Sequence, residues 1–538
     1  MQTPDPEAWR LAQAAGAAFA RRDFAAARQL AQQVIARRPL DANGNQILGL
    51  VAMEEGDFAA AKRHLERANQ AAPNQPHIMN ALGVSLRRLG DVEAARPLFT
   101  RAGEGGLIDG WRNLGNLENG ARNAEAAMAA YRRALKIAPN DAAAHAGLAR
   151  GYEAGHDLAK AKQHAEAALK NDANNEIARI ALAQVLMREK DAAGAEAAAA
   201  PIVANRGASP TNAALAWGII GDARDRRGAA HAAFEAYTNA NQILLKQNAA
   251  LLNASHLLYH PDGVARMSAL VAASDIASWR PAAASAFPAP VFLVGFPRSG
   301  TTLLDQILSS HSAIFCIEER EHFANALASV ISDEAKLAGF AALSDAEIEA
   351  ARAEYWRRVR AEDAPPADAL VVDKLPLNIV VLPLIKRVFP DAKIIFALRD
   401  PRDVILSCYV QRFGMNAAMA QFLELGRAAR YYDAVMRLMS LCREKLALHL
   451  HQVRYEDVVA DIGREARALA DFLGLPFEEA MLSFRETALA RDINTPSARQ
   501  VIEPIYTRSV QKWRRYEAEL ATALPLLNQW AARFGYQT

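Results

Sequence analysis

The chain has 538 residues, of which 51% are hydrophobic, and a formal net charge of +2. This length predicts several domains, and the small charge predicts no strong general affinity for nucleic acid or for an anionic membrane. The three cysteines are too few and too scattered for a disulfide scaffold or a zinc site: Cys316, Cys408 and Cys442. Neither a signal peptide nor an apolar run of about 20 residues, the length that spans a bilayer, is visible. We therefore expect a cytoplasmic protein.

The first 247 residues are rich in alanine and repeat with a period of about 34 residues. Pro39 and Pro73 are separated by this interval, and one slot of the repeat holds a large apolar residue followed by a small one. Its members are Leu48-Gly49, Leu82-Gly83, Leu114-Gly115, Leu148-Ala149, Leu182-Ala183 and Ile220-Gly221. A unit of this length with small residues at fixed places resembles the tetratricopeptide (TPR) repeat, and about seven units fit residues 8–247.

A stack of such helix pairs is expected to form an all-α superhelix with a concave groove. We expect the groove to bind a peptide or protein, either a substrate or a partner. The alternative is a module that only dimerises or stabilises the chain. The sequence does not show which repeat residues line the groove.

Residues 248–290 lose the period and end in a proline- and alanine-rich stretch, which predicts a linker. After it, helical patterns alternate with short apolar runs, which predict strands near 291–296, 313–317, 369–373, 393–398 and 449–454. This alternation predicts an α/β domain over 291–538, with a central parallel sheet covered on both faces. Ligands of such sheets bind beyond the carboxyl ends of the strands.

The first of these strands leads into a loop suited to a phosphate. Gly295 and Gly300 enclose four residues, and an amphipathic segment follows. A strand, a tight glycine turn and a helix N-terminus together present backbone N–H groups to an anion. Thr301 stands where the lysine of an ATP- or GTP-binding P-loop belongs, and the loop cation is Arg298. The loop is therefore P-loop-like, but it predicts a phosphate-containing ligand other than a hydrolysed ATP or GTP.

Charged residues follow three further strands, at 318–321, 373–374 and 399–403. The ends of parallel strands meet at one edge of the sheet, so we expect these side chains to face one crevice. Asp400 can cap a helix that begins at Pro401. Ser407 lies about two turns along that helix and can share a phosphate with Arg399.

These motifs resemble those of sulfotransferases that use 3'-phosphoadenosine 5'-phosphosulfate (PAPS). The segment Pro297–Leu303 resembles their phosphosulfate loop, and Arg399 with Ser407 resembles their 3'-phosphate-binding segment. Tyr455 lies in a segment similar to one that follows a late strand in the family. Ser497 and the Lys512-Trp513 pair resemble the C-terminal stretch of tyrosylprotein sulfotransferases. The resemblance covers about residues 291–515. The combination of a TPR array with such a domain resembles bacterial TPR-containing sulfotransferases.

The resemblance implies a role for each matched residue. It implies that Glu319 is the general base, with Glu318 as the alternative. It also implies that Arg298, Lys374 and Ser497 stabilise the leaving phosphate. No metal is expected. The residues implied in binding PAPS are Arg298, Ser299, Gly300, Thr301, Thr302, Arg399, Ser407, Tyr455 and Lys512.

Three other side chains near the predicted site could be either a catalytic base or a structural residue. His311 and His322 could each act as a base, as a histidine does in many cytosolic sulfotransferases, but a surface or helix-capping histidine is the preferred interpretation. Asp373, next to Lys374, is expected to be a structural partner of a cation.

The acceptor is left open. Tyrosylprotein sulfotransferases carry arginines two and six residues after the catalytic glutamate, where this chain has Glu321 and Asn325. The acceptor hydroxyl could belong to a protein or peptide tyrosine, a glycan or a small metabolite. Two other classes remain as alternatives: a P-loop kinase-like phosphotransferase and a TPR scaffold without catalysis.

Overall fold

The computed structural model describes residues 5–275, 279, 283–484 and 509–537. It divides the chain into two compact units, Met1–Arg227 and Gly228–Thr538. Among the described helices, none combines the length and the apolar character needed to cross a membrane.

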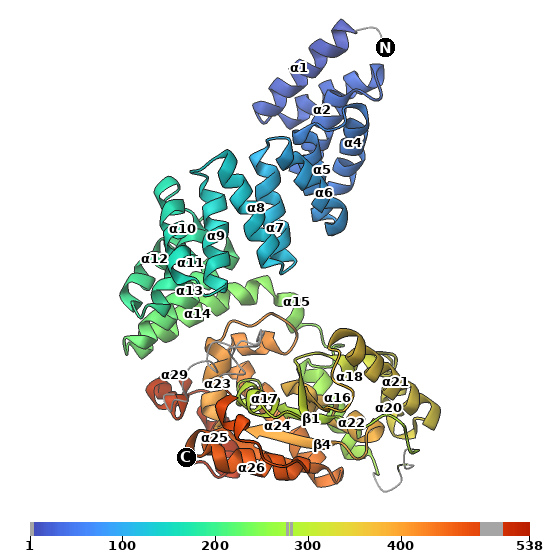
Figure 1. Cartoon of the computed structure of the whole chain (residues 1–538), viewed down its shortest axis with the longest axis vertical. Helices are drawn as coiled ribbons and strands as arrows, with labels where there is room; N and C mark the ends of the chain where they lie inside the picture. Colours follow the sequence, from blue (N-terminus) through green and yellow to red (C-terminus); the bar gives the residue numbers. More distant parts are fainter. Residues whose placement is uncertain (1–4, 276–278, 280–282, 485–508, 538) are drawn as a thin grey trace. The chain divides into compact units, whose positions relative to one another are not determined.

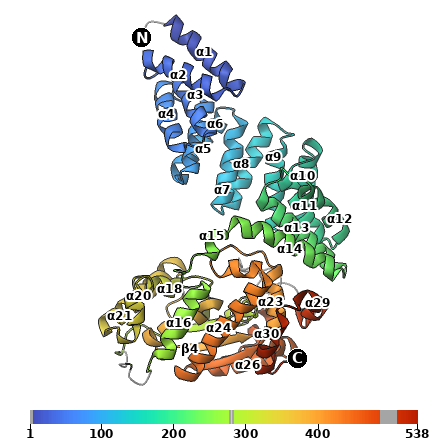
Figure 2. The ribbon, with the colours of Figure 1, turned by 180° about the vertical axis from the view of Figure 1, so that it is seen from behind.

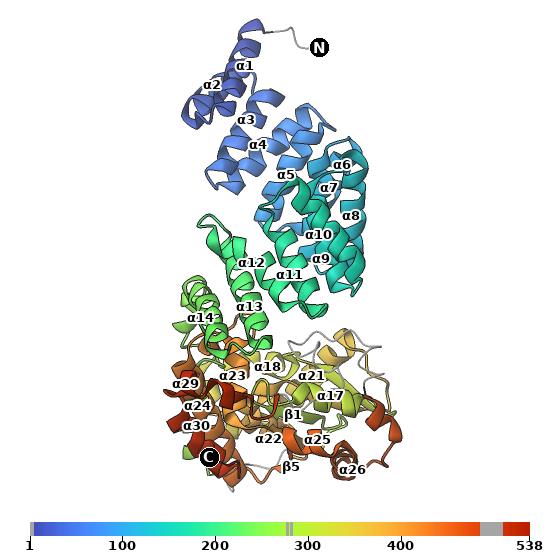
Figure 3. The ribbon, with the colours of Figure 1, turned by 90° about the vertical axis from the view of Figure 1, so that its left-hand side faces the viewer.

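The first unit consists of helices that pack in consecutive pairs (Figure 3). They are α1 (Pro6–Ala20), α2 (Phe24–Arg37), α3 (Ala42–Glu54), α4 (Phe58–Ala71), α5 (Pro76–Arg88), α6 (Val92–Glu104), α7 (Ile108–Gly120), α8 (Ala124–Ile137), α9 (Ala142–Ala154), α10 (Leu158–Asn171), α11 (Glu176–Arg188), α12 (Ala192–Ala204) and α13 (Pro210–Arg226).

The predicted repeat slots explain why these helices pack closely. A Cβ atom added to Gly49 would lie 2.5 Å from the Leu65 side chain, and one added to Gly83 would lie 2.7 Å from the Phe99 ring. The small residue of one helix thus makes room for the large residue of the next. An aspartate or asparagine caps the second helix of each of the six pairs by accepting a backbone N–H: Asp23, Asp57, Asp91, Asn123, Asp157 and Asp191. The predicted all-α TPR superhelix is confirmed.

The second unit contains a parallel sheet of five strands in the order β2-β3-β1-β4-β5. Figure 1 labels two of the central strands, β1 and β4. The strands confirm the predicted α/β class and are β1 (Val291–Gly295), β2 (Ile314–Glu318), β3 (Leu370–Lys374), β4 (Lys393–Leu398) and β5 (His449–Arg454). The α-helices are α14 (Ala230–Gln247), α15 (Ala249–Leu252), α16 (Pro261–Ala273), α17 (Thr301–Ser309), α18 (His322–Ala326), α19 (Ala328–Ile331), α20 (Glu334–Ala338), α21 (Asp345–Glu362), α22 (Leu382–Val388), α23 (Pro401–Val410), α24 (Leu425–Lys445), α25 (Tyr455–Ala460), α26 (Ile462–Leu473), α29 (Glu517–Leu520) and α30 (Leu524–Arg533).

Each face of the sheet has its own core, because side chains alternate along a strand. Phe292 and Val294 of β1 pack into the larger core with α16, α21, α22 and α24, and Figure 2 shows α16 and α24 on this side. Val291 and Leu293 pack into the smaller core with α17 and α26. The central strands β1 and β4 are therefore buried on both faces, as their continuous apolar runs predict, whereas only Val453 of the edge strand β5 is fully buried.

The domain boundaries differ from the predicted ones in two places. The boundary between the units lies at Arg227, so α14, which we predicted to end the repeat array, belongs to the second unit. Its Asn241 donates a hydrogen bond to the backbone oxygen of Tyr409 at 3.0 Å. The predicted linker contains α16, whose three core residues are completely buried: Val264, Met267 and Val271. Periodicity identifies an apolar helix face but not the surface that covers it.

Candidate active site

The loop after β1 has the backbone geometry that its glycine predicts. Gly300 has a φ of 98° and precedes the first residue of α17. A Cβ atom there would also lie 2.8 Å from Cδ2 of Tyr455, so both the conformation and the close approach require glycine. Ser299 donates its backbone N–H to the Phe296 oxygen at 3.1 Å and closes the turn. The N-terminus of α17, the helix end that presents backbone N–H groups to an anion, is therefore held beside the Tyr455 ring.

Arg298 connects the loop after β1 with α23, two segments that the resemblance assigns to opposite ends of the cofactor. Its buried side chain donates from Nε to Oγ of Ser407 at 2.9 Å. Its backbone oxygen accepts a hydrogen bond from Arg399 at 3.1 Å. Ser407, which we expect to share a phosphate with Arg399, thus also contacts the loop cation. The loop and α23 thus form one connected surface.

Arg399 has a donor that no described residue satisfies. This side chain is 7% exposed, and its Nε atom is buried without a hydrogen-bond partner in the described part of the chain. The guanidinium lies over the Tyr455 ring, 4.7 Å from its centroid, and donates to the backbone oxygen of Ser509 at 2.6 Å. A buried, unsatisfied cationic donor costs free energy unless an anion binds it. Arg298, Arg399 and the α17 N-terminus therefore fit a ligand with phosphate groups.

Ser509 is a residue that sequence reasoning missed, although it lies close to the Lys512-Trp513 pair that the resemblance pointed to. Its Oγ shares a hydrogen bond of 2.8 Å with the Tyr455 hydroxyl. The only signal was its position three residues before Lys512, which begins a 3-10 helix. We call residues 509–516 the C-terminal clasp. Ser497, also predicted to contact the cofactor, lies outside the described residues.

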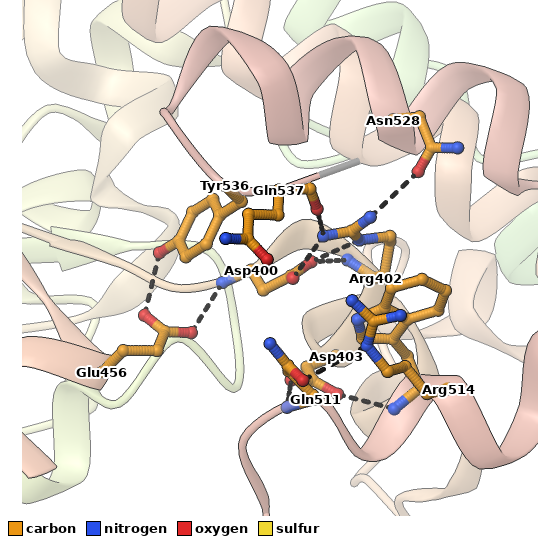
Figure 4. Close-up of polar contacts among 10 residues, drawn as sticks. Asp400, Arg402, Asp403, Glu456, Gln511, Arg514, Asn528, Tyr536 and Gln537 are labelled. Carbon is orange, nitrogen blue, oxygen red and sulfur yellow. Dashed lines mark hydrogen bonds and ion pairs between the residues drawn. The ribbon is translucent and has the colours of Figure 1, made fainter.

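Asp403 holds the C-terminal clasp against α23 (Figure 4). Its carboxylate accepts the backbone N–H groups of Gln511 at 2.7 Å and of Trp513 at 2.8 Å. Burial raises the pKa of Asp403 to about 6. The neighbouring Arg402 lies over the Trp513 ring, 4.1 Å from its centroid, and forms an ion pair of 2.7 Å with Asp400. The second half of the Arg399–Asp403 segment thus positions the clasp.

A lysine and two glutamates meet where β2 and β3 end. Nζ of Lys374, which is completely buried, lies 3.1 Å from Oε1 of Glu319 and 3.7 Å from Oε1 of Glu318. The Glu319 side chain is 34% exposed and that of Glu318 is 17% exposed. Glu319 has a φ of 49°, and its backbone N–H donates to the Lys374 oxygen at 2.8 Å. Glu319 is therefore both the closer partner of the lysine and the more accessible carboxylate.

Asp373 lies on the opposite face of β3 from Lys374 and, among the described residues, is not paired with a cation. It accepts hydrogen bonds from the Tyr355 hydroxyl at 3.1 Å and from the Asn378 amide at 3.3 Å. Burial raises the pKa of Asp373 to about 7. Its partners are thus neutral, whereas the sequence predicted a cation, because the side chain points into the larger core rather than toward the strand-end crevice.

Both histidines have structural partners. Nε2 of His311 is 2.8 Å from the Pro476 oxygen, and Nδ1 accepts the Ala313 N–H at 3.1 Å. Nε2 of His322 is 2.5 Å from the Asp363 carboxylate. We expected surface or helix-capping histidines, but both side chains are buried, at 2% exposed each, and have structural contacts. Within the ranges that the structure describes, no group of three or more His, Cys, Asp or Glu side chains could hold a metal ion.

Comparison with known proteins identifies the two parts of the chain. Residues 290–479 match the model of the sulfotransferase family. Residues 52–104 and 109–141 match models of the tetratricopeptide repeat.

Individual relatives are distant. An uncharacterized protein of Aquifex aeolicus is 30% identical over 250 residues, which are 45% of this chain and 32% of that protein. Protein-tyrosine sulfotransferase 1 of Danio rerio is 25% identical over 262 residues, 46% of this chain and 72% of that protein. The chain thus spans only about a third of the Aquifex relative. The Pseudomonas aeruginosa pilF structure matches with a TM-score of 0.35 and 14% identity over 38% of this chain and 93% of that one, and nothing further follows from it.

Proposed function

Because the chain combines TPR repeats with a domain of the sulfotransferase family, we propose that it is a PAPS-dependent sulfotransferase. The observation that carries the proposal is the pair of buried arginines beside the N-terminus of α17. Arg298 and Arg399 are joined through a backbone hydrogen bond of 3.1 Å, and Nε of Arg399 has no partner among the described residues. Such a set of donors suits a nucleotide that carries phosphates at both ends of its ribose.

The proposed reaction needs a base and a group that stabilises the leaving phosphate. PAPS, when bound, supplies a sulfuryl group on a phosphate leaving group. Transfer forms a bond between sulfur and the acceptor oxygen, breaks the bond between sulfur and the 5'-phosphate oxygen, and leaves adenosine 3',5'-bisphosphate. Glu319 takes the acceptor proton, and Arg298 and Lys374 stabilise the charge that develops on the leaving phosphate. Lys374 also orients the Glu319 carboxylate, 3.1 Å from its Nζ atom. A role for Ser497 stays a prediction.

We propose a tyrosine of a protein or peptide as the acceptor, presented by the repeats. Two observations support it: several relatives are named protein-tyrosine sulfotransferases, and a phenol, with a pKa of about 10, loses its proton to a carboxylate more readily than an alcohol does. A glycan or small metabolite is the alternative acceptor, because Glu321 and Asn325 replace the two arginines of the tyrosylprotein enzymes.

Thermal stability in the presence of nucleotides tests the proposed cofactor. Adenosine 3',5'-bisphosphate should raise the melting temperature, since a ligand at 100 times its Kd stabilises the folded state by about 2.7 kcal/mol. ATP and GTP should have little effect, and a preference for ATP would favour a kinase-like phosphotransferase. Arg399→Gln should raise the Kd of the bisphosphate about 10- to 100-fold, since it removes charge-assisted hydrogen bonds. Arg430→Gln is the matched control, because Arg430 is exposed on α24.

A further inference from the structure

The chain reverses its direction after α30 because a glycine ends this helix. α30 ends at Arg533, and Gly535 follows with a φ of 75°, in the left-handed region that favours glycine. The N–H of Gly535 donates to the Ala532 oxygen at 3.0 Å, and that of Tyr536 donates to the Ala531 oxygen at 2.8 Å. Together these two bonds form a Schellman motif. The helix end itself therefore fixes the backbone at Tyr536.

Tyr536 contacts the glutamate that follows Tyr455 in the chain. Its hydroxyl donates to Oε2 of Glu456 at 2.9 Å (Figure 4). The Arg454 guanidinium lies over the Tyr536 ring, 4.2 Å from its centroid. Burial, and then the charge of Glu456, raise the pKa of the Tyr536 hydroxyl. This hydroxyl therefore stays protonated and donates to the carboxylate.

The other oxygen of Glu456 holds the backbone next to Arg399. Oε1 accepts the backbone N–H of Asp400 at 3.1 Å (Figure 4). This N–H belongs to the planar peptide group that joins Arg399 to Asp400, so a bond to it restricts ψ of Arg399. The ring of Tyr455 lies against the Arg399 guanidinium, 4.7 Å from its carbon to the ring centroid. Two adjacent residues of α25 thus hold the backbone and the guanidinium of one arginine.

The residue after Tyr536 reaches Asp400 through a second side chain. The Gln537 oxygen accepts a hydrogen bond from Nη2 of Arg402 at 2.6 Å (Figure 4). The same guanidinium donates to both carboxylate oxygens of Asp400, at 2.7 and 2.9 Å. Asp400 and Arg402 are both buried. Residues 536–537 therefore restrain the backbone and the side chain of the residue that follows Arg399.

We propose that Tyr536 is a positioning residue for the 3'-phosphate of the nucleotide, and that it acts through Glu456 on Arg399. This role rests on the proposed PAPS site, and it adds a residue beyond the family match, which ends at residue 479. Nε of Arg399 is the buried donor that no described residue satisfies. An anion binds more tightly to a donor that is already oriented, because less conformational entropy is lost on binding.

Two nucleotides that differ only in the 3'-phosphate test this role. Isothermal titration calorimetry with the full chain gives the Kd values of adenosine 3',5'-bisphosphate and adenosine 5'-monophosphate. The wild type should bind the bisphosphate about tenfold or more tightly, because only this nucleotide reaches Arg399 with a phosphate. Tyr536→Phe should raise the Kd of the bisphosphate about three- to tenfold and leave that of the monophosphate unchanged. A residue that only stabilised the fold would affect both nucleotides equally.

Tyr431→Phe is the matched control. It also removes a tyrosine hydroxyl that donates a hydrogen bond, here to the Tyr259 oxygen at 2.8 Å, but Tyr431 lies in the larger core. This substitution should lower the melting temperature and leave the ratio of the two Kd values at its wild-type level.

Substitutions of Glu456 show whether Tyr536 acts through this carboxylate. Glu456→Ala should lose at least as much of the preference for the bisphosphate as Tyr536→Phe, and the double variant should lose no more than Glu456→Ala. Glu456→Gln should retain most of the preference. Its amide oxygen can accept the Asp400 N–H while its N–H groups donate to the Tyr536 oxygen.

The outcomes separate this role from the nucleotide assignment. An unchanged preference for the bisphosphate in Tyr536→Phe, or additive effects in the double variant, overturns the role of Tyr536 and leaves the assignment intact. A wild type that binds the two nucleotides equally overturns the assigned 3'-phosphate site and this role with it. Melting curves show whether each variant is folded, and Glu456→Ala gives the same measurement if Tyr536→Phe does not fold.

Discussion

At the scale of single residues, neighbouring side chains at the end of one strand have different surroundings and therefore different expected roles. Lys374 and Asp373 are neighbours in β3, yet one pairs with the glutamates at the sheet edge and the other with Tyr355 and Asn378 in the core. The alternation of side chains along a strand separates them. We therefore expect substitution of Lys374 to change turnover and substitution of Asp373 to change stability.

Glu319→Gln should lower kcat by about 10²- to 10⁴-fold, the range typical for loss of a general base. It should leave the stabilisation by adenosine 3',5'-bisphosphate unchanged, because Glu319 pairs with Lys374 and not with Arg298 or Arg399. Transfer of labelled sulfate from PAPS measures the first effect. Glu318→Gln is the matched control. If it abolishes turnover while Glu319→Gln does not, the base is Glu318.

Asp373 should make stability depend on pH. Burial raises its pKa to about 7, from 3.8 in an unfolded chain. The folded state therefore keeps a proton that the unfolded state releases, and the contribution of this group to stability decreases as pH rises from 4 to 7. The full difference corresponds to about 4 kcal/mol. Asp373→Asn stays neutral, so its melting temperature relative to wild type should rise between pH 5 and pH 8.

The exposed Asp391→Asn provides the comparison for that measurement. Its melting temperature should follow the wild type at both pH values. Parallel pH profiles of Asp373→Asn and the wild type would show that Asp373 does not titrate differently in the folded protein.

At the scale of elements, the clasp is joined to the anion-binding residues through α23. Asp403 accepts two N–H groups of the clasp (Figure 4). Arg399 donates to the Ser509 oxygen of the same segment. Both partners lie within the same five-residue segment after β4. The position of the clasp and the orientation of the Arg399 guanidinium are therefore coupled.

Asp403→Asn should loosen the clasp, because an amide replaces one of the two carboxylate oxygens that accept N–H groups with a donor. We expect faster hydrogen exchange of the Gln511 and Trp513 amides and a three- to tenfold higher Kd for adenosine 3',5'-bisphosphate. Asp471→Asn, an exposed aspartate on α26, should change neither. Unchanged exchange in Asp403→Asn would mean that other contacts hold the clasp.

At the scale of the whole molecule, the two compact units meet in sequence at Arg227, not at the end of the repeat pattern. The second unit includes α14 and α16 ahead of its first strand. Thr238 and Tyr409 share a hydrogen bond of 2.8 Å, and Phe234 stacks on the Tyr409 ring. The family match begins at residue 290, so it leaves out α14, α15 and α16, which the second unit contains.

A chain that begins at Gly228 should fold and bind adenosine 3',5'-bisphosphate, whereas one that begins at residue 290 should not. Loss of α16 exposes the sites of Val264, Met267 and Val271, and burial of three such side chains contributes about 5–9 kcal/mol. This is comparable to the whole stability of a domain, about 5–15 kcal/mol. Melting curves of the two proteins, with and without the bisphosphate, provide the measurement. A cooperative transition in the shorter chain would contradict the assignment of α16 to the core.

The sequence by itself determined the features that depend on local spacing. A period of about 34 residues specifies the helix pairs, apolar runs specify the strands β1 to β4, and Gly300 permits the left-handed turn before α17. Because parallel strands end at one edge, the sequence also brought Arg298, Glu319, Lys374 and Arg399 to one side of the sheet.

Only the tertiary structure decided which groups meet. The bond from Arg298 to Ser407, the clasp held by Asp403, and the neutral partners of Asp373 join segments up to 110 residues apart, and no spacing encodes them. The apolar face of α14 repeats like its predecessors but packs in the second unit. Hydrophobic burial is non-directional, so a pattern specifies that a face is covered, and only the packed chain specifies by what.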